Sequence, residues 1–325
     1  MAYKSTSGTA SNTADMLIRL KDFIIETCGW TLHDDQMTQA QPYFVAFSAG
    51  ESGREDIYLQ FINDAATNNI LVKAALYWDA SSHTAIKPVF SSGSTVIVTS
   101  DSAPFNYWIY VNPDRVYVVT RIGATYYGHY SGVIKRFWSD QIAVTQDGAD
   151  AGTNVTVSVN DASILSPGKF YVIKDNANIA RTQVTATDVS STPNTVTIAS
   201  LATAYAAGAK IGEDPQPVMV SCSGMPGGYL LNRCDGYAGQ MSHPCSAREF
   251  SGYQTGVSDP DNRYRLVAMY PILVTGDDEL RGELIDVYSI GSGAGASEDV
   301  LDLGTSTYKI FYVSGGPSTW IAVRE

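Results

Sequence analysis

The chain has few charged residues and no long apolar run. Charged residues make up 17% of its 325 residues, and Lys and Arg are scattered along it. The net charge of −12 further disfavours nucleic-acid binding, which depends on clustered basic side chains that replace counterions. No apolar run approaches the roughly 18 residues that suggest a membrane span. We therefore expect no direct nucleic-acid binding and no membrane partner.

A secretory signal and a disulfide scaffold are also missing from the sequence. The first 15 residues are polar, and no apolar segment follows a basic start. The chain has too few cysteines for a disulfide framework at this length; they are Cys28, Cys222, Cys234 and Cys245. We expect the protein to stay in the cytoplasm until assembly, with its cysteines reduced.

Tyrosine and glycine are abundant instead, with 20 and 28 residues, and this mixture favours strands and tight turns. One amphipathic helix is predicted near the N-terminus. Asn12 or Thr13 would cap it, Asp15 suits the dipole of its first turn, and apolar residues follow at helical spacing. Gly29 is placed to end the helix in the left-handed conformation.

Short β-branched or aromatic runs, separated by Gly, Ser, Asn and Asp, occupy most of the remaining chain and predict strands. The clearest runs are Tyr43–Ser48, Asp56–Ile62, Asn69–Trp78 and Ser94–Ser100, and later Tyr264–Thr275, Arg281–Ile290, Thr307–Ser314 and Thr319–Arg324.

The segment "YWIYVNPDRVYVV", Tyr107–Val119, predicts a hairpin, because Asn112 and Pro113 suit the first two positions of a tight turn. Strand alternation places Tyr107 on one face and Trp108 with Tyr110 on the other. Both faces carry bulky side chains, so we expect both to be covered.

The composition changes after Trp138. From Gln141 to about Asp214 the chain has no Trp, Cys, His or Met, and period-two runs are separated by turn signals. We predict a mainly-β protein: an antiparallel β-sandwich-like body of residues 1–139 plus 216–325, with one N-terminal helix. Residues 140–215 are predicted to form an inserted small β-barrel or sandwich domain.

Catalytic and metal sites are weakly supported. A Ser-His-Asp arrangement of His33, His83, His129 or His243 needs only spatial proximity and stays open, but no G-x-S-x-G elbow occurs. The cluster of Cys222, Cys234, His243 and Cys245 has the spacing C-x11-C-x8-H-x-C, without the tight pair that a structural zinc site favours. We expect no enzyme activity, no cofactor and no metal.

Three further motifs do not indicate a functional site. The alternating glycines Gly291, Gly293 and Gly295 predict a loop, since no helix of three turns follows them. Segment Ser258–Arg263 lacks the spaced ligands of a calcium loop. The N-glycosylation acceptor motif at Asn154 does not indicate glycosylation, because the sequence has no secretory signal.

Two segments carry a resemblance to structural proteins of tailed bacteriophages. One is "YWIYVNPDRVYVVTRIGATYYGHYSGVIKRF", Tyr107–Phe137, and the other is "RGELIDVYSIGSGAGASEDVLDLGTSTYKIFYV", Arg281–Val313. The helix ending in "CGW" is also similar to theirs, and the inserted domain looks like the small β-modules of many virion proteins. The resemblance covers about two-thirds of the chain and brings no catalytic residues.

The resemblance implies a virion component of the tail, neck, collar or baseplate, assembled in the bacterial host cytoplasm. Its expected partners are other copies of itself and other phage tail or neck proteins. Aromatic side chains are enriched where protein surfaces meet. The predicted interface residues are Tyr107, Trp108, Tyr110, Tyr117, Tyr126, Tyr127 and Tyr130. The alternative is a carbohydrate-binding host-attachment module, in which the inserted domain or the Tyr-rich strands bind sugar.

Overall fold

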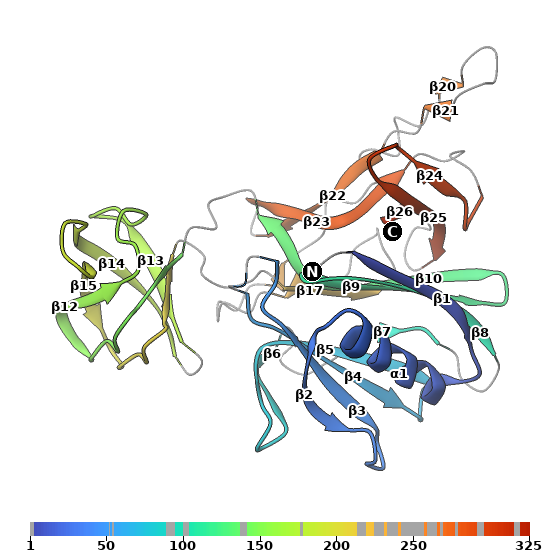
Figure 1. Ribbon diagram of the computed structural model, residues 1–325, viewed down its shortest axis with the longest axis horizontal. Helices are drawn as coiled ribbons and strands as arrows, with labels where there is room; N and C mark the ends of the chain where they lie inside the picture. The colour runs from blue at the N-terminus through green and yellow to red at the C-terminus, as the bar shows by residue number, and fades with distance from the viewer. Residues whose placement is uncertain are drawn as a thin grey trace. The chain divides into compact units, whose positions relative to one another are not determined.

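A computed structural model describes residues 3–51, 53, 55–88, 95–99, 104–136, 142–175, 178–212, 219–223, 231–232, 240–241, 257–258, 265–266, 269–276, 279–290, 296–314 and 319–325. The mainly-β fold predicted from the sequence is confirmed in this part of the chain, which has a single α-helix (Figure 1). No helix in these ranges is long and apolar enough to cross a membrane.

The chain divides into two compact units. Met1–Phe137 and Val218–Glu325 form one unit, here called the body, and Trp138–Pro217 form the other, the inserted unit. The sequence predicts that the inserted unit begins at residue 140, two residues later than in the structure, and ends at residue 215, two residues earlier.

The first layer of the body is a six-stranded sheet covered on one face by the helix α1 (Thr13–Asp22) and a π-helical turn, Phe23–Thr27. Its strands are β2 (Thr31–Gln36), β3 (Tyr43–Ser48), β4 (Ile57–Asp64), β5 (Asn69–Asp79), β6 (Thr84–Pro88) and β7 (Thr95–Ile97). The predicted helix signals act as expected: the Asn12 side chain accepts from the Asp15 N–H at 2.9 Å, and Gly29 has φ 76°.

The second layer is the aromatic hairpin with its neighbours. It consists of β1 (Lys4–Ala10), β8 (Phe105–Asn112), β9 (Arg115–Ile122), β10 (Thr125–Arg136) and β17 (Met219–Ser223). The turn forms as predicted, because the side-chain oxygen Oδ1 of Asn112 accepts from the N–H groups of Asp114 and Arg115, each at 2.9 Å. Gly132 in β10 lies against the backbone of Asp114, where a side chain would not fit.

The third layer closes on the other face of the hairpin (Figure 1). Its strands are β22 (Met269–Gly276), β23 (Glu279–Ile290), β24 (Val300–Asp302), β25 (Thr307–Ser314) and β26 (Thr319–Arg324). They share one ten-stranded sheet with the hairpin, in the order β1-β8-β9-β10-β23-β26-β25-β24. Because β10 also pairs with β25, the sheet folds back over itself and encloses a core. Four short strands complete the body: β18 (Leu231–Asn232), β19 (Gln240–Met241), β20 (Val257–Ser258) and β21 (Arg265–Leu266).

The inserted unit is a six-stranded antiparallel sheet in the order β11-β16-β13-β14-β15-β12. The strands are β11 (Ala143–Val144), β12 (Gly152–Val159), β13 (Phe170–Lys174), β14 (Ile179–Asp188), β15 (Asn194–Leu201) and β16 (Lys210–Gly212). A bridge between Thr145 and Val159 joins the two ends of this sheet, so the strands close into a small barrel. Its apolar core is built from residues of this unit alone.

Because that core is self-contained, the inserted unit is expected to fold by itself. Residues 142–212 expressed alone should give dispersed amide resonances and one cooperative thermal transition. Replacing the core residue Ile198 by Asp should abolish both, whereas replacing the exposed Val189 by Asp should preserve them, since Ile198 is 0% and Val189 57% exposed. A fragment without dispersed resonances would contradict this prediction.

Candidate functional site

The predicted interface residues lie mostly inside the chain. Tyr107, Trp108, Tyr110, Tyr117 and Tyr130 are all less than 9% exposed. A buried side chain has no surface to offer another copy, so the sequence-based interpretation of a subunit seam is wrong for these five residues.

The hairpin is buried because each of its faces has a different neighbour. Tyr107 and Ile109 pack with the helix and the first sheet. Trp108 and Tyr110 pack on the opposite face, against Phe311 and other residues of the third layer. The alternation predicted from the sequence is therefore correct, but both covers come from the same chain.

Tyr126 and Tyr127 remain partly exposed near the β9–β10 turn. The Tyr126 hydroxyl donates to the Glu298 carboxylate at 2.7 Å, and the Arg121 guanidinium donates to the same oxygen at 2.6 Å. Burial, followed by the hydrogen bond to Glu298, raises the pKa of Tyr126. Glu298 has φ 77°, an uncommon conformation for a residue of this type. This cluster attaches the start of the β24 segment to the hairpin.

A second set of exposed apolar side chains lies at β24 and its neighbour β25. Val300, Leu303 and Tyr312 are 56%, 53% and 45% exposed, and the Tyr312 ring lies 5.1 Å from the partly buried Trp320 ring. We call Val300, Leu303, Tyr312 and Trp320 the C-terminal edge surface. The sequence predicts a loop from Gly291 onward and no strand at β24, because a three-residue strand gives almost no periodic signal.

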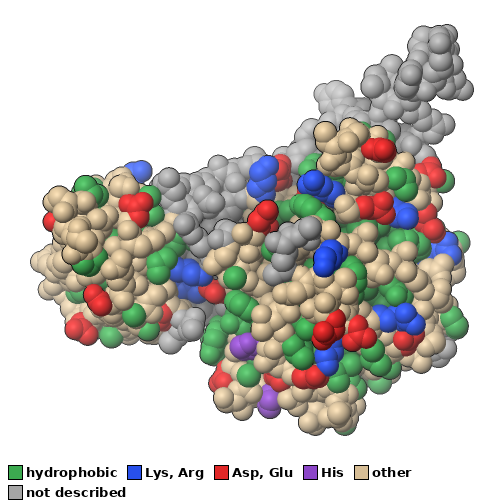
Figure 2. Space-filling view, in the orientation of Figure 1, with side chains coloured by type: hydrophobic (Ala, Val, Ile, Leu, Met, Phe, Trp, Pro, Cys, Tyr) green, Lys and Arg blue, Asp and Glu red, His purple; other side chains and the backbone are tan. Residues whose placement is uncertain are grey.

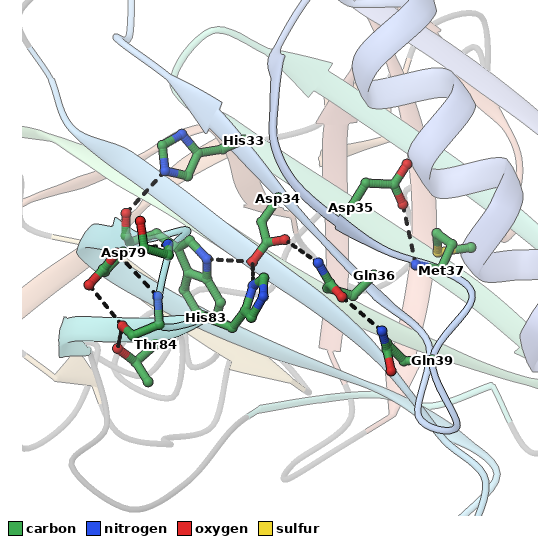
Figure 3. A network of polar contacts seen from close by, with 12 residues as sticks. His33, Asp34, Asp35, Gln36, Met37, Gln39, Asp79, His83 and Thr84 are labelled. Atoms are coloured by element: carbon green, nitrogen blue, oxygen red, sulfur yellow. Dashed lines mark hydrogen bonds and ion pairs between the residues drawn. The ribbon is translucent and has the colours of Figure 1, made fainter.

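The outer face of the first sheet carries a polar network around Asp34 (Figure 3). The Asp34 side chain is 4% exposed and accepts hydrogen bonds from Trp78 Nε1 at 2.9 Å, Gln36 Nε2 at 2.9 Å and His83 Nδ1 at 2.8 Å. His33 Nε2 contacts the Trp78 carbonyl oxygen at 3.0 Å. The network thus ties β2 to the β5–β6 hairpin.

A bulge in β2 creates this arrangement. Leu32 lies opposite Ala46 and Asp34 lies opposite Val45, so one extra residue, His33, is accommodated between them. Leu32 consequently packs toward the helix, whereas Asp34 points to the other face. No pattern in the sequence indicates that Asp34 and His83 meet.

The electrostatics of Asp34 favour its charged form. Burial alone would raise its pKa, but the hydrogen bonds from His83, Gln36 and Trp78 together outweigh burial and lower it. His83 is 47% exposed on its side chain and adopts φ 57° in the turn. Asp34 therefore orients the Nδ1 side of an imidazole that is about half exposed, an arrangement that suits hydrogen bonding to a polar ligand.

Replacing Asp34 by Asn should lower the free energy of unfolding by about 1–3 kcal/mol at pH 7, because the three donors lose their charged acceptor. The folded-state pKa is lowered, so this contribution is present at neutral pH and disappears as the pH falls through it. Urea unfolding of the two proteins should therefore converge in acid. The control Asp35→Asn removes an exposed ion pair with Lys21 and should cost less than about 1 kcal/mol. Equal effects of the two variants would contradict a special role for Asp34.

The other titratable residues singled out from the sequence are dispersed. His129 is 2% exposed, and burial lowers its pKa to about 4, so it is a neutral core residue. Burial raises the pKa of the free Cys28 thiol to about 12. Within the described ranges, no three His, Cys, Asp or Glu side chains are grouped to hold a metal ion. Cys234, His243, Cys245, Gly291, Gly293, Gly295, most of Ser258–Arg263 and the side chain of Cys222 lie outside the described residues.

Charge is mixed over the surface seen in Figure 2. The described Lys and Arg side chains lie among Asp and Glu side chains and form no continuous basic patch on this face (Figure 2). Comparison of the chain with models of known protein families finds no match, and comparison with curated proteins finds none either.

Proposed function

We propose that this chain is a structural component of a tailed-phage virion and forms a homo-oligomeric ring or collar in the tail or neck region. The two segments that resemble virion proteins supply β8, β9 and β10 on one side and β23, β24 and β25 on the other. They pack together in one core, in which Trp108, Tyr117 and Phe311 are buried. The resemblance therefore covers a single packed unit of the body.

The observation that carries the proposal is the C-terminal edge surface. Val300, Leu303 and Tyr312 are each about half exposed and lie on β24, directly after it, and on β25, at the end of the ten-stranded sheet. Val300 lies on the sheet face of its partner Lys309, and Tyr312 lies on the other face beside Trp320, so both faces expose an apolar side chain here. Exposed large apolar side chains that another subunit could cover favour self-association. The net charge of −12 would keep such a ring from clinging to DNA that passes along its axis.

The test is to locate the chain in purified virions of the phage that encodes it. Mass spectrometry should detect it in particles, and imaging with an antibody should place it at the tail or neck in a ring of several copies. Particles that carry the Val300→Asp and Leu303→Asp chain should have lost that ring. Scattered single copies, or occurrence only in a soluble host-cell complex, would contradict the proposal.

Carbohydrate binding in host attachment is a second candidate, favoured by one residue of the inserted unit. Phe170 is 55% exposed on β13, and the Arg181 guanidinium lies 5.2 Å from the centre of its ring. Exposed rings with polar neighbours suit stacking on sugars. Phe170→Ala should abolish binding to host-surface glycans, with Val189→Ala as the control of similar exposure. Absence of glycan binding by the wild-type chain would exclude this candidate.

A further inference from the structure

The exposed apolar side chains of the body gather at two places. Among its described residues, four large apolar side chains are 45% or more exposed: Ile18, Val300, Leu303 and Tyr312. Ile18 lies on α1, which follows β1 in the chain, Val300 and Leu303 lie on or directly after β24, and Tyr312 lies on β25. β1 and β24 are the first and the last strand of the ten-stranded sheet (Figure 1).

Both of these strands have an open side. Among the described strands, β1 pairs with β8 alone and β24 with β25 alone. Backbone N–H and C=O groups on an open side form a template for another strand. β1 keeps a regular register with β8 over seven residues and has no proline or bulge, which are common protections of an edge.

We infer that β1 of one copy pairs antiparallel with β24 of a second copy, so that the sheet continues from chain to chain. Charge complementarity supports a second copy as the occupant, because the β1 edge carries exposed Lys4 and the β24 edge carries exposed Asp302. Within the chain, Lys4 donates to the Thr27 carbonyl oxygen and one Asp302 carboxylate oxygen accepts from the Gly304 N–H, so both groups keep capacity for a further partner. The register that places these two side chains opposite each other also places Thr6 opposite Val300. Opposite charges and β-branched pairs at such positions stabilise antiparallel strands. Ile18 and the C-terminal edge surface would then flank the joint.

Joining two different edges makes the contact head-to-tail. Such a contact repeats from copy to copy and closes into a ring when the rotation allows it. The inference thus rests on the proposed function and specifies the seam of the ring, while the joint itself is defined without reference to a virion.

A charge-reversal series on the full-length chain tests the joint. In sedimentation measurements over a range of concentrations, Lys4→Glu and Asp302→Lys should each weaken self-association severalfold, and the double variant should restore it. Asp150→Lys makes the same charge change at an exposed site of the inserted unit and should have no effect. Failure of the double variant to recover would overturn the inference.

Cross-linking distinguishes this joint from a symmetric one. Under oxidation, a mixture of the Thr6→Cys and Val300→Cys chains should give a disulfide-linked dimer, and a chain with both changes should give a ladder of multimers. Self-linking of either single variant to the same extent, or no link between them, would overturn the joint. Links in solution, with the chain absent from particles, would leave the joint standing and remove the virion role. A ring in particles without this link would support the virion role and overturn the joint.

Discussion

Replacement of Trp108 by alanine is expected to lower the free energy of unfolding of the body by about 3–5 kcal/mol. Trp108 is 6% exposed, and its ring lies 5.3 Å from Phe311 and 5.8 Å from Tyr126. Truncation would leave a cavity between the hairpin and β25, because neither strand can move without breaking its hydrogen bonds. Denaturant unfolding followed by circular dichroism measures the change.

Tyr312→Ala is the matched control for this variant. It removes an aromatic ring from the same ten-stranded sheet, but the ring is 45% exposed, so the stability of the monomer should change by less than about 1 kcal/mol. A stable Trp108→Ala monomer that had lost self-association would restore the subunit seam predicted from the sequence. We expect instead that Trp108→Ala destabilises the monomer and leaves the contact between copies unchanged, because that contact is proposed at the sheet edges.

Replacement of Gly132 by alanine should lower the free energy of unfolding by at least about 3 kcal/mol. A Cβ atom at this position would lie 2.3 Å from the Asp114 carbonyl oxygen and 2.6 Å from the Arg115 Cα atom. Both obstacles are backbone atoms of the hairpin turn, so no rotamer change relieves the clash. The close approach allows the Val133 N–H to donate to the Asp114 carbonyl oxygen at 2.9 Å. Thermal unfolding of the full chain should therefore show a large loss in the transition of the body.

The same substitution at Gly152 is the control. There the added Cβ atom would meet Val155 at 3.5 Å, an ordinary contact, so the stability of the inserted unit should change by less than about 1 kcal/mol. If Gly132→Ala proved equally mild, the tight crossing of β10 over the hairpin turn would be refuted.

Local sequence patterns were sufficient for much of the architecture. Capping by Asn12 depends on residues within one turn, and the turn at Asn112 needs only its own side chain and the next three residues. The strands Tyr43–Ser48, Thr307–Ser314 and Thr319–Arg324 have the predicted bounds, because period-two alternation is a property of the strand itself. The mainly-β class follows from the sum of such signals.

The Asp34 network could not be predicted in this way. Its carboxylate and the His83 imidazole are 49 residues apart in sequence, and they meet only because a bulge turns Asp34 to the outer face. Neither the bulge nor the fold of the β5–β6 hairpin has a clear signal in the sequence.

Alternation along the strands already requires that both faces of the aromatic hairpin be covered, since it places bulky side chains on each face. Only the folded chain shows which residues cover them. Trp108 meets Phe311, a residue 203 positions later in the chain, so the ring is buried within the chain. The folded structure also left Val300 exposed on β24, which among the described strands pairs with β25 alone. Periodicity tells which face of a strand is apolar, whereas the identity of its neighbour depends on contacts between distant segments, which no local pattern contains.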